Sequence, residues 1–504
     1  MTLRGALPCI FLLLIAATAQ GASVSVDLNG APAEVVAYED LEVVHFPFPG
    51  PTNVRIQRLD GQAIGEHRIR PERLGYHGEG QGAELTFTLE QPRQLIVNVD
   101  KLRKLLLIAE RPHPDKPSGP KVVNAVAAGA DPSGKADSTA ALQQAIDGLA
   151  PGGVLYFPAG QYLSGSLELK SEMTLYLDFG ALLKGSPDPE THRFQKSYLY
   201  FLRGTDLHDV RIAGPGIIDA NGNAVRTAWQ TKLKQTKVPG RALLLQRIRN
   251  LELRDVTVRD SYSWNVHLVE CDHARIDNVK VLSNVTHSNG DGFDIDGCVD
   301  VEMSNCFVYA EDDAISPKAS WSHRTPEKYR IRDCILWSQN ATGIRLGDET
   351  DAPEFRDMVF ENIDILRANS MLRIYNYDGG DLHGIVFRNI WLGEYSADVQ
   401  ELGYEETART KPAHEGVTSL LHIYVRPRTE KSRLGVVHDI LLDGIHSQKL
   451  AKTRLTGTAR DDGRKSIRDI RFKDCWEGDR ALPTLEVLRV KVGEDASEVS
   501  VIAP

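Results

Sequence analysis

The sequence predicts an all-β protein in which a small antiparallel β-domain precedes a long β-solenoid. Along most of the chain, short runs alternate apolar with polar residues, which is typical of strands that bury one face. Beyond roughly residue 200 these runs share one template, with most periods in the high twenties. Strands repeated at a fixed period indicate coils that stack on one another to bury a common core. Unrelated strands of a β-sandwich are the alternative.

Composition and charge narrow the classes of partner. The 504 residues suffice for two domains or one long solenoid, and their composition is that of an ordinary globular protein. The formal net charge is −10, and no basic stripe interleaved with aromatic residues occurs, so we expect no nucleic-acid partner. No stretch is long and apolar enough to span a membrane, so we expect no membrane partner. We also expect a monomer.

Residues 1–22 are predicted to be a secretory signal peptide, which would make the mature protein secreted or periplasmic. Arg4 is the early cation, an apolar run extends from Ile10 to Ala17, and small residues follow. An odd number of cysteines without paired spacing argues against a disulfide framework, although one pair remains possible. The cysteines beyond the predicted peptide are Cys271, Cys298, Cys306, Cys334 and Cys475.

The elements before the repeats are predicted as follows. Residues 23–111 form the small β-domain, which either binds carbohydrate or caps the solenoid. Residues 112–120 form a stiff, proline-rich linker, and residues 121–504 form the solenoid. A Ser or Thr cap followed by Leu142, Ile146 and Leu149 at helical spacing predicts one amphipathic helix that plugs an end of the solenoid.

The repeated template runs polar–apolar–polar–apolar–polar–Asn/Asp–apolar. We expect the Asn residues at its sixth position to form a ladder at a turn, and the cysteines that follow some of them to be buried thiols. The nine copies begin at Asp209, Asn250, His273, Asp300, Lys328, Asp357, Gly384, Asp439 and Asp469. The ladder residues are Asn278, Asn305, Asn362 and Asn389.

The stretch between Asn289 and Lys318 carries Asp291, Asp294, Asp296, Asp312 and Asp313, and stacking the inward residues of successive coils shows how they align. Neighbouring strands lie ~4.8 Å apart, so Asp291 and Asp313 should be near neighbours, with Asp312 adjoining. Carboxylates this close cannot all ionise freely, and at least one should hold a proton near neutral pH. The predicted outward columns are Asp291, Asp313, Thr342 and Ser370; Asp294, Ser316, Arg345 and Arg373; and Asp296, Lys318, Gly347 and Tyr375.

A protonated acid beside ionised carboxylates is what hydrolysis of a glycosidic bond requires. The alternatives are a calcium site or a structural ladder of Asx turns. Calcium takes six to eight oxygen ligands, and the positive charges of Lys318, Arg345 and Arg373 would repel a cation bound nearby. We therefore expect no metal.

Five segments in order resemble the polygalacturonase-type glycoside hydrolases (family 28), over most of the chain after the linker. They are Gly-Pro-Gly-Ile-Ile-Asp-Ala-Asn-Gly from Gly214, Arg-Ala-Leu-Leu-Leu from Arg241, Asp-Ser-Tyr-Ser-Trp-Asn-Val-His from Asp260, Asn-Gly-Asp-Gly from Asn289, and Asp-Asp-Ala-Ile-Ser-Pro-Lys from Asp312. The resemblance implies a right-handed parallel β-helix, an O-glycosyl hydrolase without a cofactor, and a pectin-like polysaccharide or oligosaccharide as substrate.

The resemblance also implies roles for single residues. Asp312 would be the general acid, while Asp291 and Asp313 would hold and deprotonate the attacking water, which inverts the anomeric carbon. Arg373 would bind substrate. The other residues expected to line the substrate cleft are Arg345, Lys318, Tyr375, Trp264, His267 and Asn289.

Two departures concern the substrate rather than the chemistry. The family's Gly-His-Gly is Ala341-Thr342-Gly343 here, and its Arg-Ile-Lys is Arg373-Ile374-Tyr375, so a histidine and a lysine are missing. We hypothesise that Arg345 and Arg373 still meet an acidic sugar, because two stacked cations repel without an anion. Pairing with Asp294, Asp348 or Glu349 is the alternative. A polysaccharide lyase and a non-catalytic glycan-binding β-helix are the competing functions.

Overall fold

The computed structural model describes residues 21–113, 116–234, 238–396 and 418–502. The chain divides after Pro112 into two compact units, which we describe separately. Nearly all of the predicted signal peptide lies outside the described residues. Among the described helices, none is long and apolar enough to cross a membrane.

The N-terminal unit is a small β-domain built from two five-stranded sheets that share an apolar core. Its strand pairs are antiparallel except for β4 with β10, which are parallel. The first sheet has the order β2 (Ala31–Ala33), β1 (Val24–Leu28), β5 (Thr52–Arg58), β8 (Glu84–Leu89) and β7 (Glu79–Gln81). The second has the order β3 (Val36–Tyr38), β4 (Leu41–Pro47), β10 (Lys104–Glu110), β9 (Gln94–Val99) and β6 (His67–Arg70).

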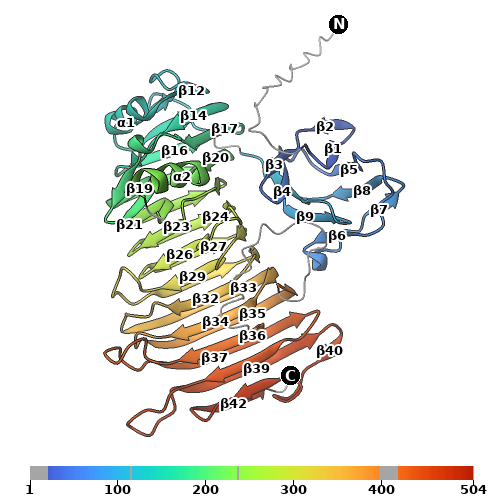
Figure 1. Cartoon of the computed structure of the whole chain (residues 1–504), viewed down its shortest axis with the longest axis vertical. Helices are drawn as coiled ribbons and strands as arrows, with labels where there is room; N and C mark the ends of the chain where they lie inside the picture. The colour runs from blue at the N-terminus through green and yellow to red at the C-terminus, as the bar shows by residue number, and fades with distance from the viewer. Residues whose placement is uncertain (1–20, 114–115, 235–237, 397–417, 503–504) are drawn as a thin grey trace. The chain divides into compact units, whose positions relative to one another are not determined.

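The second unit is a parallel β-solenoid of 32 described strands, which confirms the predicted fold class (Figure 1). Each coil contributes strands to three parallel stacks. The stack that carries the candidate site, called here the site sheet, consists of β15 (Leu167–Glu168), the first parts of β19 (Tyr198–Ala213) and β21 (Gly240–Arg254), β23 (Trp264–Val269), β26 (Phe293–Asp296), β29 (Ile315–Lys318), β32 (Thr342–Asp348), β34 (Ser370–Asn376), β36 (Ser419–Val425), β38 (Lys452–Thr456) and β41 (Val490–Val492).

The other two stacks complete the coils. One consists of β11 (Val122–Asn124), β13 (Gly153–Phe157), β16 (Met173–Leu177), the second parts of β19 and β21, β24 (Asp272–Asp277), β27 (Val299–Ser304), β30 (Glu327–Arg332), β33 (Glu354–Ala368), β35 (Asp381–Tyr395), β37 (Val436–Ser447), β39 (Ile467–Glu477) and β42 (Ala496–Ile502). The other consists of β12 (Ser133–Asp137), β14 (Gly160–Ser164), β17 (Ala181–Gly185), β20 (Ile217–Asp219), β22 (Thr257–Arg259), β25 (Lys280–Leu282), β28 (Phe307–Ala310), β31 (Ile335–Ser338) and the second parts of β33, β35, β37 and β39.

The predicted Asn ladder forms at the corner between these two stacks. Asn362 donates to Asp333 (3.3 Å) and accepts from Asn389 (3.2 Å), so side-chain amides and carboxylates of successive coils bond to one another. Asn278 and Asn305 donate in the same way to carboxylates of the preceding coil. All these residues have positive φ, a conformation that Asn adopts more easily than most residues.

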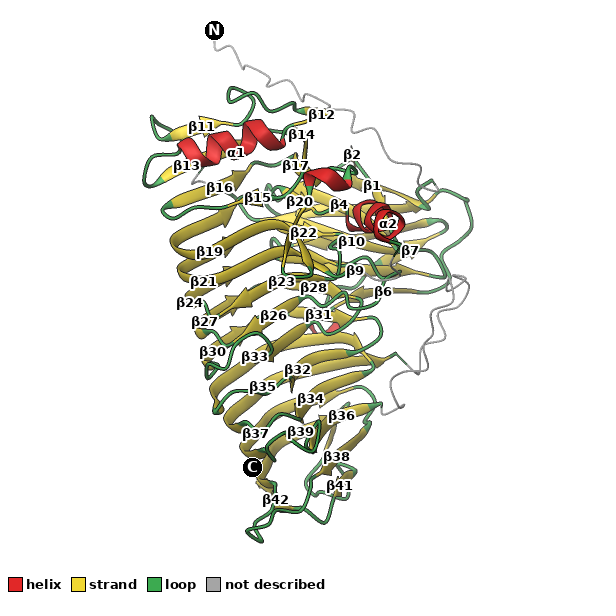
Figure 2. Ribbon diagram, turned by 60° about the vertical axis from the view of Figure 1, so that its left-hand side comes forward, coloured by secondary structure: helices red, strands yellow, loops and turns green. Residues whose placement is uncertain are grey.

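One amphipathic helix, α1 (Thr139–Gly148), lies at the N-terminal end of the solenoid, as predicted (Figure 2). It buries Leu142 and Ile146 in the solenoid core. The five described cysteines are buried, free thiols. A second helix, α2 (Gly222–Leu233), was not predicted. Val225 and Trp229, four residues apart and buried, were the overlooked helical signal.

The predicted register of the site sheet is confirmed. Asp294 lies opposite Ser316, Asp296 opposite Lys318, Arg345 opposite Arg373, and Gly347 opposite Tyr375. Just before these strands, the N–H of Gly292 donates to the carbonyl of Asp313 (2.9 Å), which continues the alignment. This register places the aspartates of one coil beside those of the next.

Candidate active site

The aspartates that end the loops before β26 and β29 form the acidic centre of the site sheet. Asp291 and Asp313 are buried, with 3% and 2% of their surface exposed, and Asp312 is half-buried. Each precedes a strand whose alternating apolar residues enter the core, which fixes the backbone from which the carboxylates extend.

Asp313 is held as an anion by two donors from the next coil. Its Oδ1 accepts from the N–H of Thr342 (3.1 Å), and its Oδ2 accepts from the Arg345 guanidinium (2.7 Å). Burial alone would raise the pKa of Asp313, but Arg345 and Lys318 outweigh it and lower that pKa below its usual range.

Asp312 has the opposite preference. Burial, together with the charges of Asp313 and Glu311, raises the pKa of Asp312 to about 7. Its backbone carbonyl accepts from the Ser338 hydroxyl (2.7 Å), and the Glu311 carboxylate accepts from the Asn340 amide (2.9 Å). The Asp312 backbone and the Glu311 side chain are therefore both held by the next coil. Two consecutive carboxyls therefore favour different protonation states at neutral pH.

Asp291 shares its surroundings with Asp294 and Lys318. The Lys318 ammonium lies 2.7 Å from Asp294 Oδ1 and 3.7 Å from Asp291 Oδ2. Burial, followed by the charges of Asp294 and Asp312, raises the pKa of Asp291 well above its usual value. Burial likewise raises the pKa of Asp294 to about 6, although Lys318 and Arg241 oppose the shift. Asp291 Oδ1 is buried and has no hydrogen-bond partner among the residues that the structure describes, so it is available to a water or a sugar hydroxyl.

Asp294 and Asp296 point out of the core, as the alternation predicts, but both are completely buried rather than open to solvent. Asp296 accepts from the Ser320 N–H (3.0 Å) and hydroxyl (2.6 Å) and from the Trp321 N–H (2.8 Å). These bonds hold the segment after β29 over the strand, so Asp296 is a structural anchor for Trp321.

Next to Asp294 and Asp296, the acidic centre is covered by aromatic and cationic side chains, called here the Trp264 wall. The Arg241 guanidinium carbon lies 3.7 Å from the centre of the Trp264 ring, and the Lys318 ammonium lies 3.9 Å from that ring. His267 lies edge-on to both Trp264 and Trp321 with ring centres 5.0 Å apart, and burial lowers the pKa of His267 to about 4. The neutral imidazole accepts from Arg241 Nε (3.2 Å) through Nδ1.

The two arginines predicted to share a column are adjacent but differ in their partners. Arg345 forms ion pairs with Asp313 and Asp348, so the alternative of pairing with Asp348 holds. Arg373 is 6% exposed and has no ion pair among the described residues; its Nε has no hydrogen-bond partner there. The substrate-binding role of Arg345 stays a prediction, and the structure shows that it also holds Asp313.

The remaining predicted residues are spread along the same face. Tyr375 is half-buried and hydrogen-bonds to His422 Nδ1 through its hydroxyl (2.7 Å). Asn289 is exposed, with φ of 65°, and its carbonyl accepts from Ser263 (3.1 Å). Among the described residues, no group of three or more His, Cys, Asp or Glu side chains is arranged to hold a metal ion.

Sequence reasoning assigned no role to several residues that shape the site: Arg241, Glu311, Trp321 and His422. Arg241 stood in a family-like segment, and His422 continues the Arg345–Arg373 column by one coil. The covering role of Trp321 had no signal, because it depends on the path of the loop after β29.

Comparison with known proteins gives one consistent family. The model of "Glycosyl hydrolases family 28" matches residues 153–421, more than half of the chain. A protein of Vitis vinifera named "Probable polygalacturonase" is 30% identical over 271 residues, which are 48% of this chain and 54% of the relative. "Exo-poly-alpha-D-galacturonosidase" of Dickeya chrysanthemi is 26% identical over 332 residues, which are 54% of this chain and 55% of the relative. The chain thus matches about half the length of these curated relatives.

Solved structures agree on the fold. A hyperthermoactive exopolygalacturonase from Thermotoga maritima superposes with a TM-score of 0.55 at 19% identity, covering 77% of this chain and 92% of that one. A polygalacturonase from Erwinia carotovora ssp. carotovora superposes with a TM-score of 0.54 at 16% identity, covering 78% of this chain and 99% of that one. From the extent of the family match, the chain belongs to glycosyl hydrolases family 28.

Proposed function

We propose that this member of a glycosidase family hydrolyses the glycosidic bonds of a pectin-like, uronic-acid-containing polysaccharide or oligosaccharide, with inversion at the anomeric carbon. One observation carries the proposal. Asp312 and Asp313 are adjacent, yet the pKa of Asp312 is raised to about 7 while that of Asp313 is lowered. Two carboxyl groups whose pKa values are pushed apart supply the acid and the base of such a reaction.

In this mechanism Asp312 donates its proton to the leaving glycosidic oxygen as the bond from that oxygen to the anomeric carbon breaks. Asp313 accepts a proton from a water that forms the new bond to that carbon. Asp291 Oδ1, which accepts no hydrogen bond from the described part of the chain, orients this water. Thr342 and Arg345 keep Asp313 ionised and fixed before substrate arrives. Thr342, which stands where the family motif has its histidine, contributes its backbone N–H to this arrangement.

An acidic sugar is supported by Arg373. Its buried guanidinium lies one strand beyond Arg345 and has no carboxylate partner among the described residues. A planar guanidinium binds a carboxylate through two parallel hydrogen bonds. The curated relatives are named as enzymes of galacturonan, which agrees with this chemistry, while Tyr375 in place of a lysine removes one cation from the site.

The proposal is tested by analysing the products formed from homogalacturonan, rhamnogalacturonan and xylogalacturonan side by side, with wild type and Asp312→Asn. We expect reducing ends from at least one polymer with wild type, and at least a hundredfold less with Asp312→Asn. Equal values for the two proteins on every polymer would show a glycan-binding protein instead. Products absorbing in the ultraviolet, with an unsaturated sugar at one end, would show a lyase.

We also propose that the enzyme acts in the periplasm or outside the cell. The support is the sequence pattern of residues 1–22. N-terminal sequencing of the protein recovered from outside the cytoplasm should find a start close to residue 20; an intact Met1 would contradict export by this route.

A further inference from the structure

The site sheet continues for three strands beyond Arg373, and the outward residues of the first two, β36 and β38, are basic and aromatic rather than acidic. On β36, His422 lies opposite Arg373 and Tyr424 opposite Tyr375; on β38, Arg454 lies opposite His422. Arg426 follows β36 directly. We call Arg373, Tyr375, His422, Tyr424, Arg426 and Arg454 the arginine–tyrosine strip.

The arginines of the strip form no ion pair among the described residues, although the charge of Arg373 helps to lower the pKa of Asp313. Arg345 pairs with Asp313 and Asp348, and Arg428 pairs with Asp378, but Arg373, Arg426 and Arg454 have no ion pair there. Burial, followed by the charges of Arg373 and Arg454, lowers the pKa of His422 to about 4, so the imidazole between them stays neutral and stabilises neither. Arg373 and Arg454 lie two strands apart, roughly 10 Å at the usual strand spacing, with only the neutral imidazole of His422 between them, so an anion bound there would relieve their repulsion.

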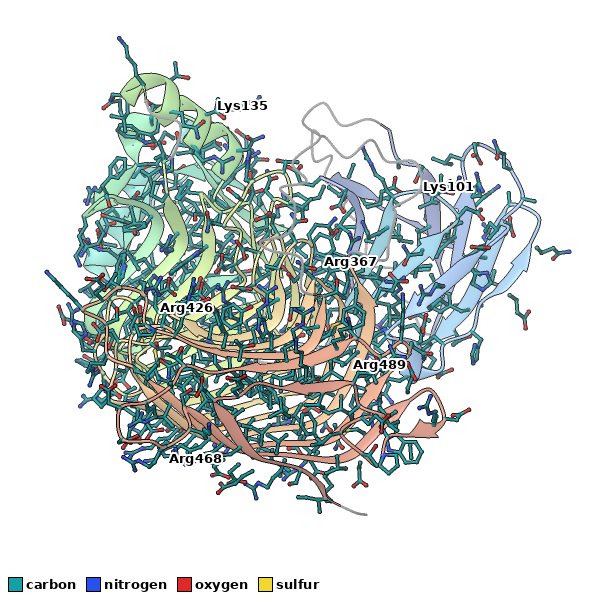
Figure 3. The ribbon with its side chains drawn as sticks, turned by 60° about the horizontal axis from the view of Figure 1, so that its bottom comes forward. Lys101, Lys135, Arg367, Arg426, Arg468 and Arg489 are labelled. Carbon is teal, nitrogen blue, oxygen red and sulfur yellow. The ribbon has the colours of Figure 1, made fainter. Side chains whose placement is uncertain are left out.

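The aromatic rings lie close enough to form one apolar surface between the cations. The Tyr424 ring centre lies 5.8 Å from that of Tyr375 and 5.7 Å from that of His422. The Arg426 guanidinium carbon lies 5.2 Å from the Tyr424 ring and 5.4 Å from the Tyr377 ring. Figure 3 labels Arg426 among the side chains of the solenoid, together with Arg468 and Arg489.

We propose that the arginine–tyrosine strip binds further uronic-acid residues of the substrate, distal to the scissile bond, with Arg426 and Arg454 meeting sugar carboxylates and Tyr424 packing on a sugar ring. Guanidiniums supply the paired donors that a carboxylate accepts, and an aromatic ring between them suits the apolar face of a sugar. This inference rests on the proposed function, because it extends the same cleft from β34 to β38. It predicts that the protein prefers long acidic chains to short ones.

The test measures binding by isothermal titration calorimetry with Asp312→Asn as the background, so that the probe is not consumed. The probes are galacturonate dimers and hexamers, and hexamers whose carboxyls are methyl-esterified. Adding Arg426→Gln and Arg454→Gln together should raise the Kd for the acidic hexamer at least tenfold and change the Kd for the dimer less than twofold. The Kd for the acidic hexamer should then be close to that for the esterified hexamer. Arg454→Lys, which keeps the charge, should recover part of the loss.

Arg468→Gln is the matched control, because Arg468 is half-buried on β39 and pairs with β37 in another stack. It should leave hexamer binding unchanged. Equal losses for dimer and hexamer, or no loss in the double variant, would overturn the role of the strip even if wild type hydrolyses the polymer. Selective hexamer binding that depends on Arg426 and Arg454, with no hydrolysis by wild type, would keep the strip and refute the enzyme.

Discussion

Asp312 and Asp313 are chemically identical neighbours whose surroundings separate them. Asp313 receives two donors from the next coil, whereas burial and the charges of Asp313 and Glu311 raise the pKa of Asp312 to about 7, so of these two carboxyls it is Asp312 that retains a proton near neutral pH. The acid and base roles therefore come from the contacts that each carboxyl makes with adjoining coils.

The dependence of kcat/KM on pH should be bell-shaped. The base Asp313 must be ionised, and because its pKa is lowered the acidic limb should lie below the ordinary range of a carboxyl. The acid Asp312 must be protonated, so activity should fall as pH rises through about 7. In Asp312→Asn, residual activity should lose the alkaline limb; a limb that persists at the same pH would assign it to another group.

Replacing Arg345 should act on Asp313. Arg345→Gln removes the cation that lowers the pKa of Asp313, so the acidic limb should move to higher pH by about one unit or more, with lower kcat and little change in KM. Arg345→Lys should keep most of that limb in place. Arg373→Gln is the contrasting variant, with a higher KM on acidic substrate; an unchanged acidic limb in Arg345→Gln would refute the positioning role.

At the scale of elements, the ladder of Asn and Asp residues connects coil to coil. Asn362→Ala removes the side-chain hydrogen bonds to the coils on both sides. It also places alanine, which adopts positive φ less easily than asparagine, at a position of positive φ. We expect it to lower the free energy of unfolding by about 1–3 kcal/mol, measured by chemical denaturation. Asn362→Gly, which adopts this φ freely, should cost less; equal losses would show that the hydrogen bonds alone matter.

The strand register was predictable because alternation fixes which residues face the core, and the core residues of successive coils must stack. That argument predicts Arg345 beside Arg373 and Asp296 beside Lys318, as the structure has them. It could not show that Asp294 and Asp296 are covered, because the cover is built by Arg241, Trp264 and Trp321 from other coils and loops. Nor could it decide between Asp313 and a sugar as the partner of Arg345, since both lie within reach of the side chain.

At the scale of the whole molecule, the acidic centre should make the solenoid less stable in alkali. A carboxyl whose folded pKa is raised from its ordinary value to about 7 contributes stability at low pH, which is lost as pH rises toward and through 7. Asp312→Asn removes the buried charge, so it should raise the melting temperature by about 1–3 °C at pH 8 and have little effect at pH 4. A variant that is destabilised at pH 8 would contradict the strain assigned to this carboxyl.

The solenoid brings together residues from consecutive coils into one long outward face, on which the acidic centre lies between the Trp264 wall and the arginine–tyrosine strip. Because each coil contacts only its neighbours, the chemistry and the length preference are carried by different strands and can be changed separately. Variants of Arg426 and Arg454 should thus alter chain-length preference without moving the pH limbs set at Asp312 and Asp313.

The most direct test of the central claim is the configuration of the newly formed reducing end, followed by proton NMR during the first minutes of hydrolysis of the best galacturonan substrate. A water held by Asp313 and Asp291 while Asp312 protonates the leaving oxygen should give the inverted anomer first, before mutarotation. Initial release of the retained anomer would contradict this assignment of the three aspartates.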